Sequence, residues 1–407
     1  MKRCYILILS ILMVSSLLIA SACQPSVSYI YETIPPVTVP ETRVQFNTVN
    51  QTITTTTNIT ATTTLTSPTT VTNTTTATNT IAAPITVMAT TTTTVTTTIQ
   101  AKTLVSGVLV TGTTTWGLAN SPYALTGNVQ VPTGGILIIQ AGVVVDLRDK
   151  FIQVDGTLQV IGIAGQPVTM SAFGTTDNNN SGIIFTANST GWDEVLQTGS
   201  IIQNAIIQDN IIRINGGAPK ITSNTFVATG SALTDNGDAL VGIAIWSEGR
   251  ATIIGNSFKL RMGNGIALWG LGTVKIEHNS FEGRIVNAGN QTGRETIAIN
   301  LYSQLQTGAI FSNTIFNNNT GLRIALNNAQ PFQINITGNA IYNNSLNARV
   351  VGSGTGDINM PNNWWGTADA AAIAAKIYDY NQDFRLGKII YTPFLTSMPT
   401  DVPVLPP

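Results

Sequence analysis

One six-residue pattern recurs along the second half of the chain and limits the folds that the chain can adopt. It consists of an apolar residue, two others, an asparagine, any residue, and an apolar or aromatic residue. It occurs as "IIQNAI" (Asn204), "ITSNTF" (Asn224), "IIGNSF" (Asn256), "IEHNSF" (Asn279), "IFSNTI" (Asn313), "ITGNAI" (Asn339) and "MPNNWW" (Asn363). The intervals between successive asparagines are 20, 32, 23, 34, 26 and 24 residues. The shortest interval suits one turn of a three-stranded coil, and the longer intervals indicate insertions at one corner.

Such a coil cannot bury its inward side chains alone, so we expect the coils to stack and their equivalent strands to pair in parallel. The repeated Ile and Phe residues would then form apolar columns inside. The repeated asparagines would lie at tight corners with left-handed backbone, where their amides hydrogen-bond from coil to coil. Only 10% of the residues are charged, which fits closely spaced parallel strands.

Turn-forming residues between short apolar runs also predict strands. Short β-branched runs in "GNVQVPTGGILIIQAGVVVDL" and "FIQVDGTLQVIG" are separated by Gly, Pro and Asp. A helical pattern is nearly absent until "ADAAAIAAKI", for which Thr367 or Asp369 is a candidate N-cap. We therefore predict an all-β domain over residues 104–395, closed by a short C-terminal capping helix, and a Pro-rich tail over 396–407. Trp365 aligns with the core Ile and Phe positions and is expected to be buried.

The chain resembles the right-handed parallel β-helix proteins of the pectin-lyase-like superfamily. The resemblance rests on the asparagine repeat, on strands such as "GIAIW", "GIALW" and "GLRIAL", and on "NNWWGT" followed by "IYDYNQDFRLGKIIYTPFL". It implies roughly eight to ten three-stranded coils. It leaves the activity open, because the superfamily includes lyases, hydrolases, esterases, adhesins and surface proteins without known activity.

The N-terminus predicts export. "MKRC" is basic, "YILILSILMVSSLLIA" is apolar and "SAC" is small, which is the pattern of a signal peptide over residues 1–22. "IASAC" resembles the lipobox of bacterial lipoproteins, which implies lipid attachment at Cys23, although Ala20 replaces the usual leucine. An ordinary cleaved signal and an uncleaved anchor helix are the alternatives. Of the 50 residues from Gln51 to Gln100, 27 are threonine and none is charged, so residues 23–103 are interpreted as an extended low-complexity stalk.

Catalytic strings of the superfamily are missing. The chain contains neither the "DD" and "GHG" of pectin hydrolases nor the "RxPxxR" of pectate lyases, and its one histidine, His278, adjoins a corner asparagine. Both cysteines, Cys4 and Cys23, are N-terminal, so the β domain contains no thiol for a metal such as copper. The net charge of −1 makes nucleic acid an unlikely partner.

Alternation along the "GIAIW" strand points Ile243 and Ile245 inward and Ala244 and Trp246 outward. Aligning the equivalent segments predicts one outward column with Arg213, Ala244, Ala267, Ala298, Arg323 and Arg349, and a second with Asn215, Trp246, Trp269, Asn300, Ala325 and Val351. Aromatic rings and guanidinium groups in such columns could bind sugar rings and carboxylates. Asp235 and Asp238 are candidate ligands for calcium, although calcium takes more oxygen ligands than these two carboxylates supply. Alternatively, Trp246 and Trp269 pack beneath insertions and the arginines are solvated.

These observations predict a surface-displayed, lipid-anchored β-helix protein that binds polysaccharide or cell-envelope glycan without catalysis, its domain facing the extracytoplasmic side. A lyase or hydrolase with a site around Asp235, Asp238, Arg213, Arg323 and Arg349 is the first alternative. A structural surface-layer or adhesin-like protein is the second.

Overall fold

The structure is a computed structural model that describes most of the chain beyond residue 101. The described residues are 102–109, 111–171, 182–228, 242–261, 263–285, 295–302, 306–327 and 332–404, together with the backbone of 52–57, 69–80, 90–99, 234–235 and 238–241.

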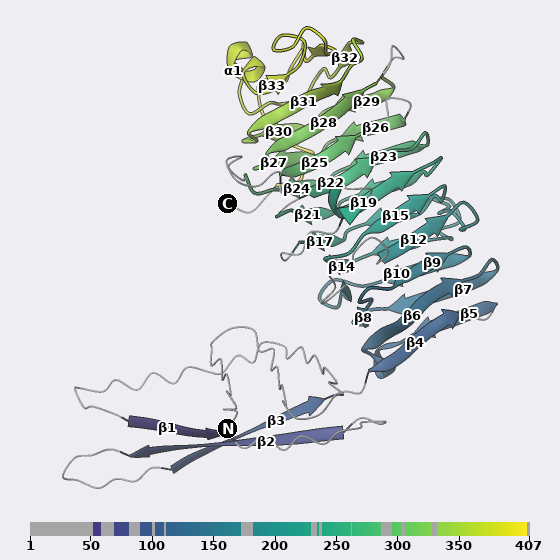
Figure 1. The fold of residues 1–407 in the computed structure, drawn as a ribbon, viewed down its shortest axis with the longest axis vertical. Helices are drawn as coiled ribbons and strands as arrows, with labels where there is room; N and C mark the ends of the chain where they lie inside the picture. Colours follow the sequence, from purple (N-terminus) through teal and green to yellow (C-terminus); the bar gives the residue numbers. More distant parts are fainter. Residues whose placement is uncertain are drawn as a thin grey trace, which may run out of the picture. The chain divides into compact units, whose positions relative to one another are not determined.

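The β domain is a parallel β-helix whose strands form three faces (Figure 1). Face 1 is a nine-stranded sheet and corresponds to nine coils, within the predicted range. Its strands are β5 (Gly112–Trp116), β7 (Gly135–Gln140), β10 (Thr157–Ile161), β13 (Ile201–Gln203), β16 (Lys220–Thr222), β20 (Ala251–Ile254), β23 (Thr273–Glu277), β26 (Thr307–Phe311) and β29 (Ile334–Thr337).

Faces 2 and 3 belong to one continuous sheet that bends around a corner. Face 2 consists of β8 (Val144–Asp146), β11 (Val168–Ser171), β14 (Ala205–Gln208), β17 (Thr225–Val227), β21 (Ser257–Lys259), β24 (Ser280–Glu282), β27 (Thr314–Phe316) and β30 (Ala340–Tyr342). Face 3 consists of β9 (Phe151–Val154), β12 (Gly182–Thr186), β15 (Ile212–Asn215), β19 (Asp238–Trp246), β22 (Gly263–Leu268), β25 (Thr296–Leu301), β28 (Thr320–Leu326), β31 (Leu346–Gly352) and β33 (Ile377–Tyr378).

A few elements lie outside this three-face pattern. At the N-terminal end β4 (Thr103–Val108) pairs with β6 (Tyr123–Val131), which pairs with both β8 and β9. The remaining elements are η1 (Leu118–Asn120), β18 (Thr234–Asp235), β32 (Ile358–Asn359), β34 (Ile389–Ile390) and α1 (Ala370–Ala374). The first strands therefore begin the stack close to the predicted residue 104.

The interior consists of the predicted apolar columns. Phe226, Phe258 and Phe281 are fully buried and stack on successive coils, with ring centroids 4.5 and 4.6 Å apart. This spacing is close to the distance between paired strands, so equal residues on successive coils fall into contact. Burial of each such side chain stabilises the fold by roughly 1.5–3 kcal/mol.

The corner asparagines form a ladder along the stack, as predicted. The side-chain Nδ2 of each ladder residue donates to Oδ1 of the next, at 2.9–3.0 Å. The members of this asparagine ladder are Asn224, Asn256, Asn279, Asn313, Asn339 and Asn363, each at most 1% exposed.

Two details of the corner prediction are wrong. The left-handed residue is the one before the ladder asparagine, for example His278 with φ 52° and Ser312 with φ 54°, because that residue makes the turn while the amide points to the next coil. Asn204 is not in the ladder: it has φ 49° itself, and Ala205 occupies the ladder position, donating its N–H to Asn224 Oδ1 at 2.9 Å.

The C-terminal end of the stack carries the predicted helix (Figure 1). Asp369 caps α1, with its Oδ1 accepting the N–H of Ala371 at 2.9 Å, and Ile373 of the helix is fully buried. Trp365 is 2% exposed and belongs to the core, whereas Trp364 is half-buried. Beyond the helix, Ser312 Oγ donates to the Asp401 carboxylate at 2.8 Å. Part of the segment 396–404 thus lies against earlier coils.

The Thr-rich tract is described only by its backbone strands. β1 (Thr52–Thr57), β2 (Thr69–Thr80) and β3 (Thr90–Ile99) form a separate three-stranded sheet, in which β1 and β2 are antiparallel. Threonine favours this extended backbone even without an apolar face. The signal peptide and Cys23 lie outside the described residues.

Candidate functional site

The outward side of face 3 holds most of the residues predicted to bind a ligand. On β19, Ile243 and Ile245 are fully buried in the main core, whereas Trp246 is half-buried on the other side of the strand. The predicted alternation is therefore confirmed. Across β15 and β19, Arg213 pairs with Ala244 and Asn215 with Trp246, as the alignment predicts.

The predicted position of Asn300 is wrong by two residues. Asn300 is the register partner of Ala267 and does not lie beside Trp269. On the next coil, the register partner of Asn300 is Arg323. Ala298, expected in the arginine column, is buried in the main core. A shift of two residues keeps Asn300 on the outward face, so the alternation of the sequence could not reveal this error in its position.

Tyr302 occupies the position beside Trp269 and was missed. Trp246 and Trp269 stack with ring centroids 4.3 Å apart and an interplanar angle of 9°. Trp269 and Tyr302 stack at 4.5 Å and 13°. We call these three half-buried rings the aromatic strip. Aligning "INLY" on "IALW" by its final aromatic residue would have identified Tyr302.

The aromatic strip packs against a second, smaller apolar cluster formed by Ile211, Ala244 and Ala267. The alanines point outward from face 3 and are nevertheless fully buried. Since the rings stack on one another, they use their faces for mutual contact and can offer a ligand mainly their edges. This geometry favours the packing interpretation for part of each ring and limits a sugar to contact along the edges.

Two arginines lie at the C-terminal end of the aromatic strip. Arg323 Nη1 donates to Asn300 Oδ1 at 3.0 Å, and the Arg323 guanidinium lies 5.2 Å from the Tyr302 ring centroid. Arg349 is the register partner of Arg323 on the next coil, and its guanidinium lies 5.5 Å from the ring centroid of Tyr378. We call Arg323 and Arg349 the arginine pair.

The two members of the pair differ in their remaining contacts. The Nε of Arg349 is buried and has no hydrogen-bond partner among the described residues. Arg213 is 6% exposed and lies four coils from Arg323, beyond Asn300, Ala267 and Ala244. The structure therefore brings Arg323 and Arg349 together and leaves Arg213 at the other end of the strip.

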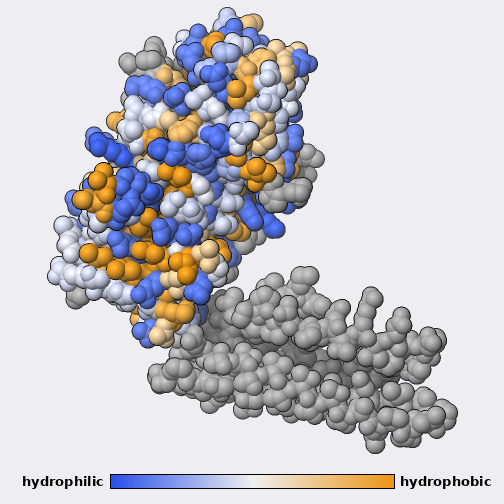
Figure 2. Space-filling view, turned by 180° about the vertical axis from the view of Figure 1, so that it is seen from behind, coloured by the Kyte–Doolittle hydropathy of each residue, from blue (hydrophilic) through white to orange (hydrophobic). Residues whose placement is uncertain are grey.

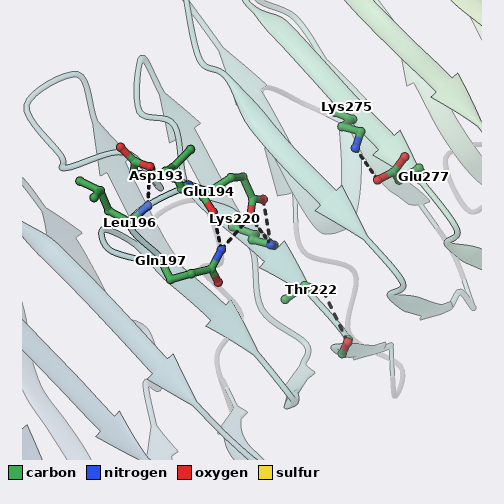
Figure 3. Close-up of polar contacts among 10 residues, drawn as sticks. Asp193, Glu194, Leu196, Gln197, Lys220, Thr222, Lys275 and Glu277 are labelled. Carbon is green, nitrogen blue, oxygen red and sulfur yellow. Dashed lines mark hydrogen bonds and ion pairs between the residues drawn. The ribbon is translucent and has the colours of Figure 1, made fainter.

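On face 1, unlike at the arginine pair, two lysines form ion pairs with carboxylates. Lys220 lies 2.8 Å from Glu194, and Lys275 lies 2.6 Å from Glu277 (Figure 3). The hydrogen bond from Lys220 holds the pKa of the Glu194 carboxyl below its ordinary value. These lysines have carboxylate partners, which makes them poor candidates for binding an external anion.

The predicted calcium ligands stay untested. Asp235 and Asp238 are backbone register partners across the antiparallel pair β18–β19, but their side chains lie outside the described residues. Among the residues that the structure describes, no group of three or more His, Cys, Asp and Glu side chains could hold a metal ion. His278 has a corner position, with its Nε2 3.8 Å from Asp401 Oδ2.

Figure 2 shows separate hydrophobic patches among hydrophilic residues on one side of the described β domain. None of the helices in the described part of the chain has the length and apolarity needed to cross a bilayer.

The fold defines the chain as a parallel β-helix protein with a ring-and-arginine surface on face 3. Comparison of the chain with models of known protein families, with curated proteins and with solved structures found no significant match. The assignment to a particular superfamily is therefore a proposal.

Proposed function

We propose that this chain is an exported, lipid-anchored β-helix protein of the pectin-lyase-like type that binds an acidic polysaccharide of the cell envelope on face 3, without catalysis. The asparagine repeat and the parallel stack support the kinship, and the lipobox-like "IASAC" supports the anchor. The Thr-rich tract would hold the β domain away from the membrane.

The state of Arg349 is the observation that carries the binding proposal. Its guanidinium is held over the Tyr378 ring, and its buried Nε has no acceptor among the described residues. A buried donor without an acceptor costs free energy, and a carboxylate can satisfy a guanidinium through two parallel hydrogen bonds. A carboxylate bound at Arg349 would therefore complete an incomplete site.

Arg323 extends this site toward the aromatic strip. Register partners on paired strands lie about 4.8 Å apart, so the arginine pair presents two cations within reach of one anionic sugar. Tyr302 and Asn300 hold the Arg323 side chain in place. Beyond it, the ring edges of the aromatic strip supply an apolar border for the next sugar unit.

The experiment is affinity chromatography of the full chain on immobilised polygalacturonate and on neutral dextran. Arg349→Met keeps the stem over Tyr378 but removes the charge, and we expect it to weaken polygalacturonate binding about tenfold or more. Lys275→Met on face 1 is the matched control, because Lys275 is paired with Glu277. Equal retention of both variants and the unaltered protein would refute the site.

The same incubation distinguishes binding from catalysis. Unsaturated chain ends would indicate a lyase, and new reducing ends alone a hydrolase, so either product would replace the non-catalytic proposal. Intact polymer together with Arg349-dependent retention supports it.

The anchor is tested separately by Cys23→Ala. Loss of the lipid acceptor should move the protein from the membrane fraction to the soluble fraction of fractionated cells. Continued retention in the membrane fraction would exclude Cys23 as the point of attachment.

A further inference from the structure

A hollow lies at the C-terminal end of the stack, and neither arginine of the arginine pair lines it. It has a volume of about 460 Å³, which is within the range of small-molecule sites. Four segments line it: Ile285 after β24, the corner after β30, the residues after the last ladder asparagine, and the region of α1. Its lining includes Asn343, Ser345, Trp365, Thr367, Ala372 and Lys376. We call it the cap pocket.

Some polar side chains of this lining already form hydrogen bonds with other parts of the protein. Asn344 Nδ2 donates to Asn347 Oδ1 at 3.0 Å, and Asn347 Nδ2 donates to the carbonyl of Trp365 at 3.3 Å. Lys376 Nζ donates to the carbonyls of Asn344 and Ser345, at 3.3 and 3.4 Å. These contacts fix the walls, so the pocket does not have to be assembled when a ligand arrives.

Other polar groups of the lining are unused. The side chains of Asn343 and Ser345 make no hydrogen bond with any described residue, and both residues are exposed. Asn343 is a corner residue with φ 55°, so its backbone is locked by the turn. An amide and a hydroxyl two residues apart offer both donors and acceptors to one ligand.

Trp365 supplies an independent sign of an incomplete site. It is 2% exposed, and its indole Nε1 is buried without a hydrogen-bond partner in the described part of the chain. A buried indole N–H usually finds an acceptor. The indole N–H of Trp365 is thus an unused donor on a residue that lines the cap pocket.

The lining also selects the class of ligand. The described lining contains no carboxylate, so a cation has no counter-ion there. Its single ammonium group, on Lys376, donates to two main-chain carbonyls and has one donor left, which a sugar hydroxyl can accept. The remaining groups are neutral amides, hydroxyls and the apolar surface of Ile285, Trp365 and Ala372, which match a neutral polyhydroxyl ring.

We propose that the cap pocket binds a single neutral sugar unit, such as a hexose or an N-acetylhexosamine. Asn343 and Ser345 would bond its hydroxyls, and Trp365 would form the wall behind the ring. This site does not depend on the acidic-polysaccharide site of the arginine pair.

The proposal is tested by titrating the full chain with glucose, galactose and N-acetylglucosamine, followed by saturation-transfer NMR and tryptophan fluorescence. We expect millimolar binding of at least one sugar. The double variant Asn343→Ala with Ser345→Ala should weaken it about tenfold. Asn335→Ala, an exposed asparagine on face 1, is the matched control and should bind as the unaltered protein does.

A second variant fills the pocket without removing a polar group. Ala372 is exposed on α1, so Ala372→Trp should abolish sugar binding while the melting temperature stays unchanged. Arg349→Met should leave sugar binding intact, which separates this site from the proposed acidic-polysaccharide site. Absence of binding to all three sugars, or binding unaffected by Ala372→Trp, would overturn the proposal.

Discussion

Asn256 and Asn279 are 23 residues apart in sequence, yet the side-chain Nδ2 and the backbone N–H of Asn256 both donate to Oδ1 of Asn279, each at 2.9 Å. Asn279 repeats the arrangement toward Asn313. Each internal ladder amide thereby satisfies buried backbone groups as well as its neighbour. A buried polar network of this kind stabilises only when it is complete.

Removal of one ladder amide should therefore be costly. Asn279→Ala removes the side-chain bonds to Asn313 Oδ1 and to the Ile253 carbonyl, and it leaves the backbone N–H of Asn256 without an acceptor. Asn256 Nδ2 loses one of its acceptors and keeps the carbonyls of Ile221 and Ile254. We expect a loss of about 3 kcal/mol or more in the free energy of unfolding, measured by urea denaturation. Asn335→Ala, exposed on face 1, should change it by about 0.5 kcal/mol or less. Similar values for the two variants would show that the ladder does not stabilise the stack.

The phenylalanine stack should respond to side-chain volume. Phe258 contacts Phe226 and Phe281 on both sides, so Phe258→Ala should lower the free energy of unfolding by about 3–5 kcal/mol. Phe258→Leu keeps most of the volume and should cost about 1 kcal/mol. The exposed neighbour Lys259 serves as control, because Lys259→Ala removes no buried surface. Equal effects of Ala and Leu at position 258 would contradict tight packing there.

The aromatic strip can be divided into packing and ligand contact. Trp246→Ala and Trp269→Ala should each cost about 2 kcal/mol, because the rings are half-buried. Since the rings stack, the double variant should cost about 1 kcal/mol less than the sum of the two. Trp269→Phe keeps a ring in the strip and should retain binding to polygalacturonate. Lost stability with unchanged retention in the double variant would assign the strip to packing alone.

Asp155 should contribute to the acid sensitivity of the first coils. Burial raises the pKa of its carboxyl. Hydrogen bonds from Thr186, Gln130 and Gln153 together lower this pKa by more than burial raises it, so the net pKa lies below the ordinary value. A depressed pKa in the folded state means that the stabilisation is present above the unfolded pKa of about 3.9 and is lost as the pH falls below it.

We therefore expect Asp155→Asn to flatten the dependence of the melting temperature on pH between about 4 and 2. Asp357→Asn, at an exposed carboxylate without a hydrogen-bond partner among the described residues, is the control. An unchanged slope for Asp155→Asn would show that the carboxyl does not contribute through its ionised form.

The candidate site could be predicted only in part. The alternation of β19 placed Trp246 correctly, and the equivalence of Arg323 and Arg349 is confirmed by their register. Asn300 was misplaced and Tyr302 was missed, because β22 and β25 are joined by an insertion. The register between the two strands therefore cannot be obtained by counting residues. The cap pocket had no sequence signal, since its lining comes from four separate segments.

By itself the sequence determined the parallel stack, the asparagine ladder from Asn224 to Asn363, the buried Trp365 and the short C-terminal helix, whose N-cap it left open between Thr367 and Asp369. These features follow from local periodicity, and repeated coils convert a local pattern into a three-dimensional column. Only the tertiary structure decided the register across the insertions, the left-handed residue at each corner, and the pairing of rings with arginines on face 3. Those features depend on how coils of unequal length align, and a shift of two residues preserves the apolar pattern while it changes which side chains meet.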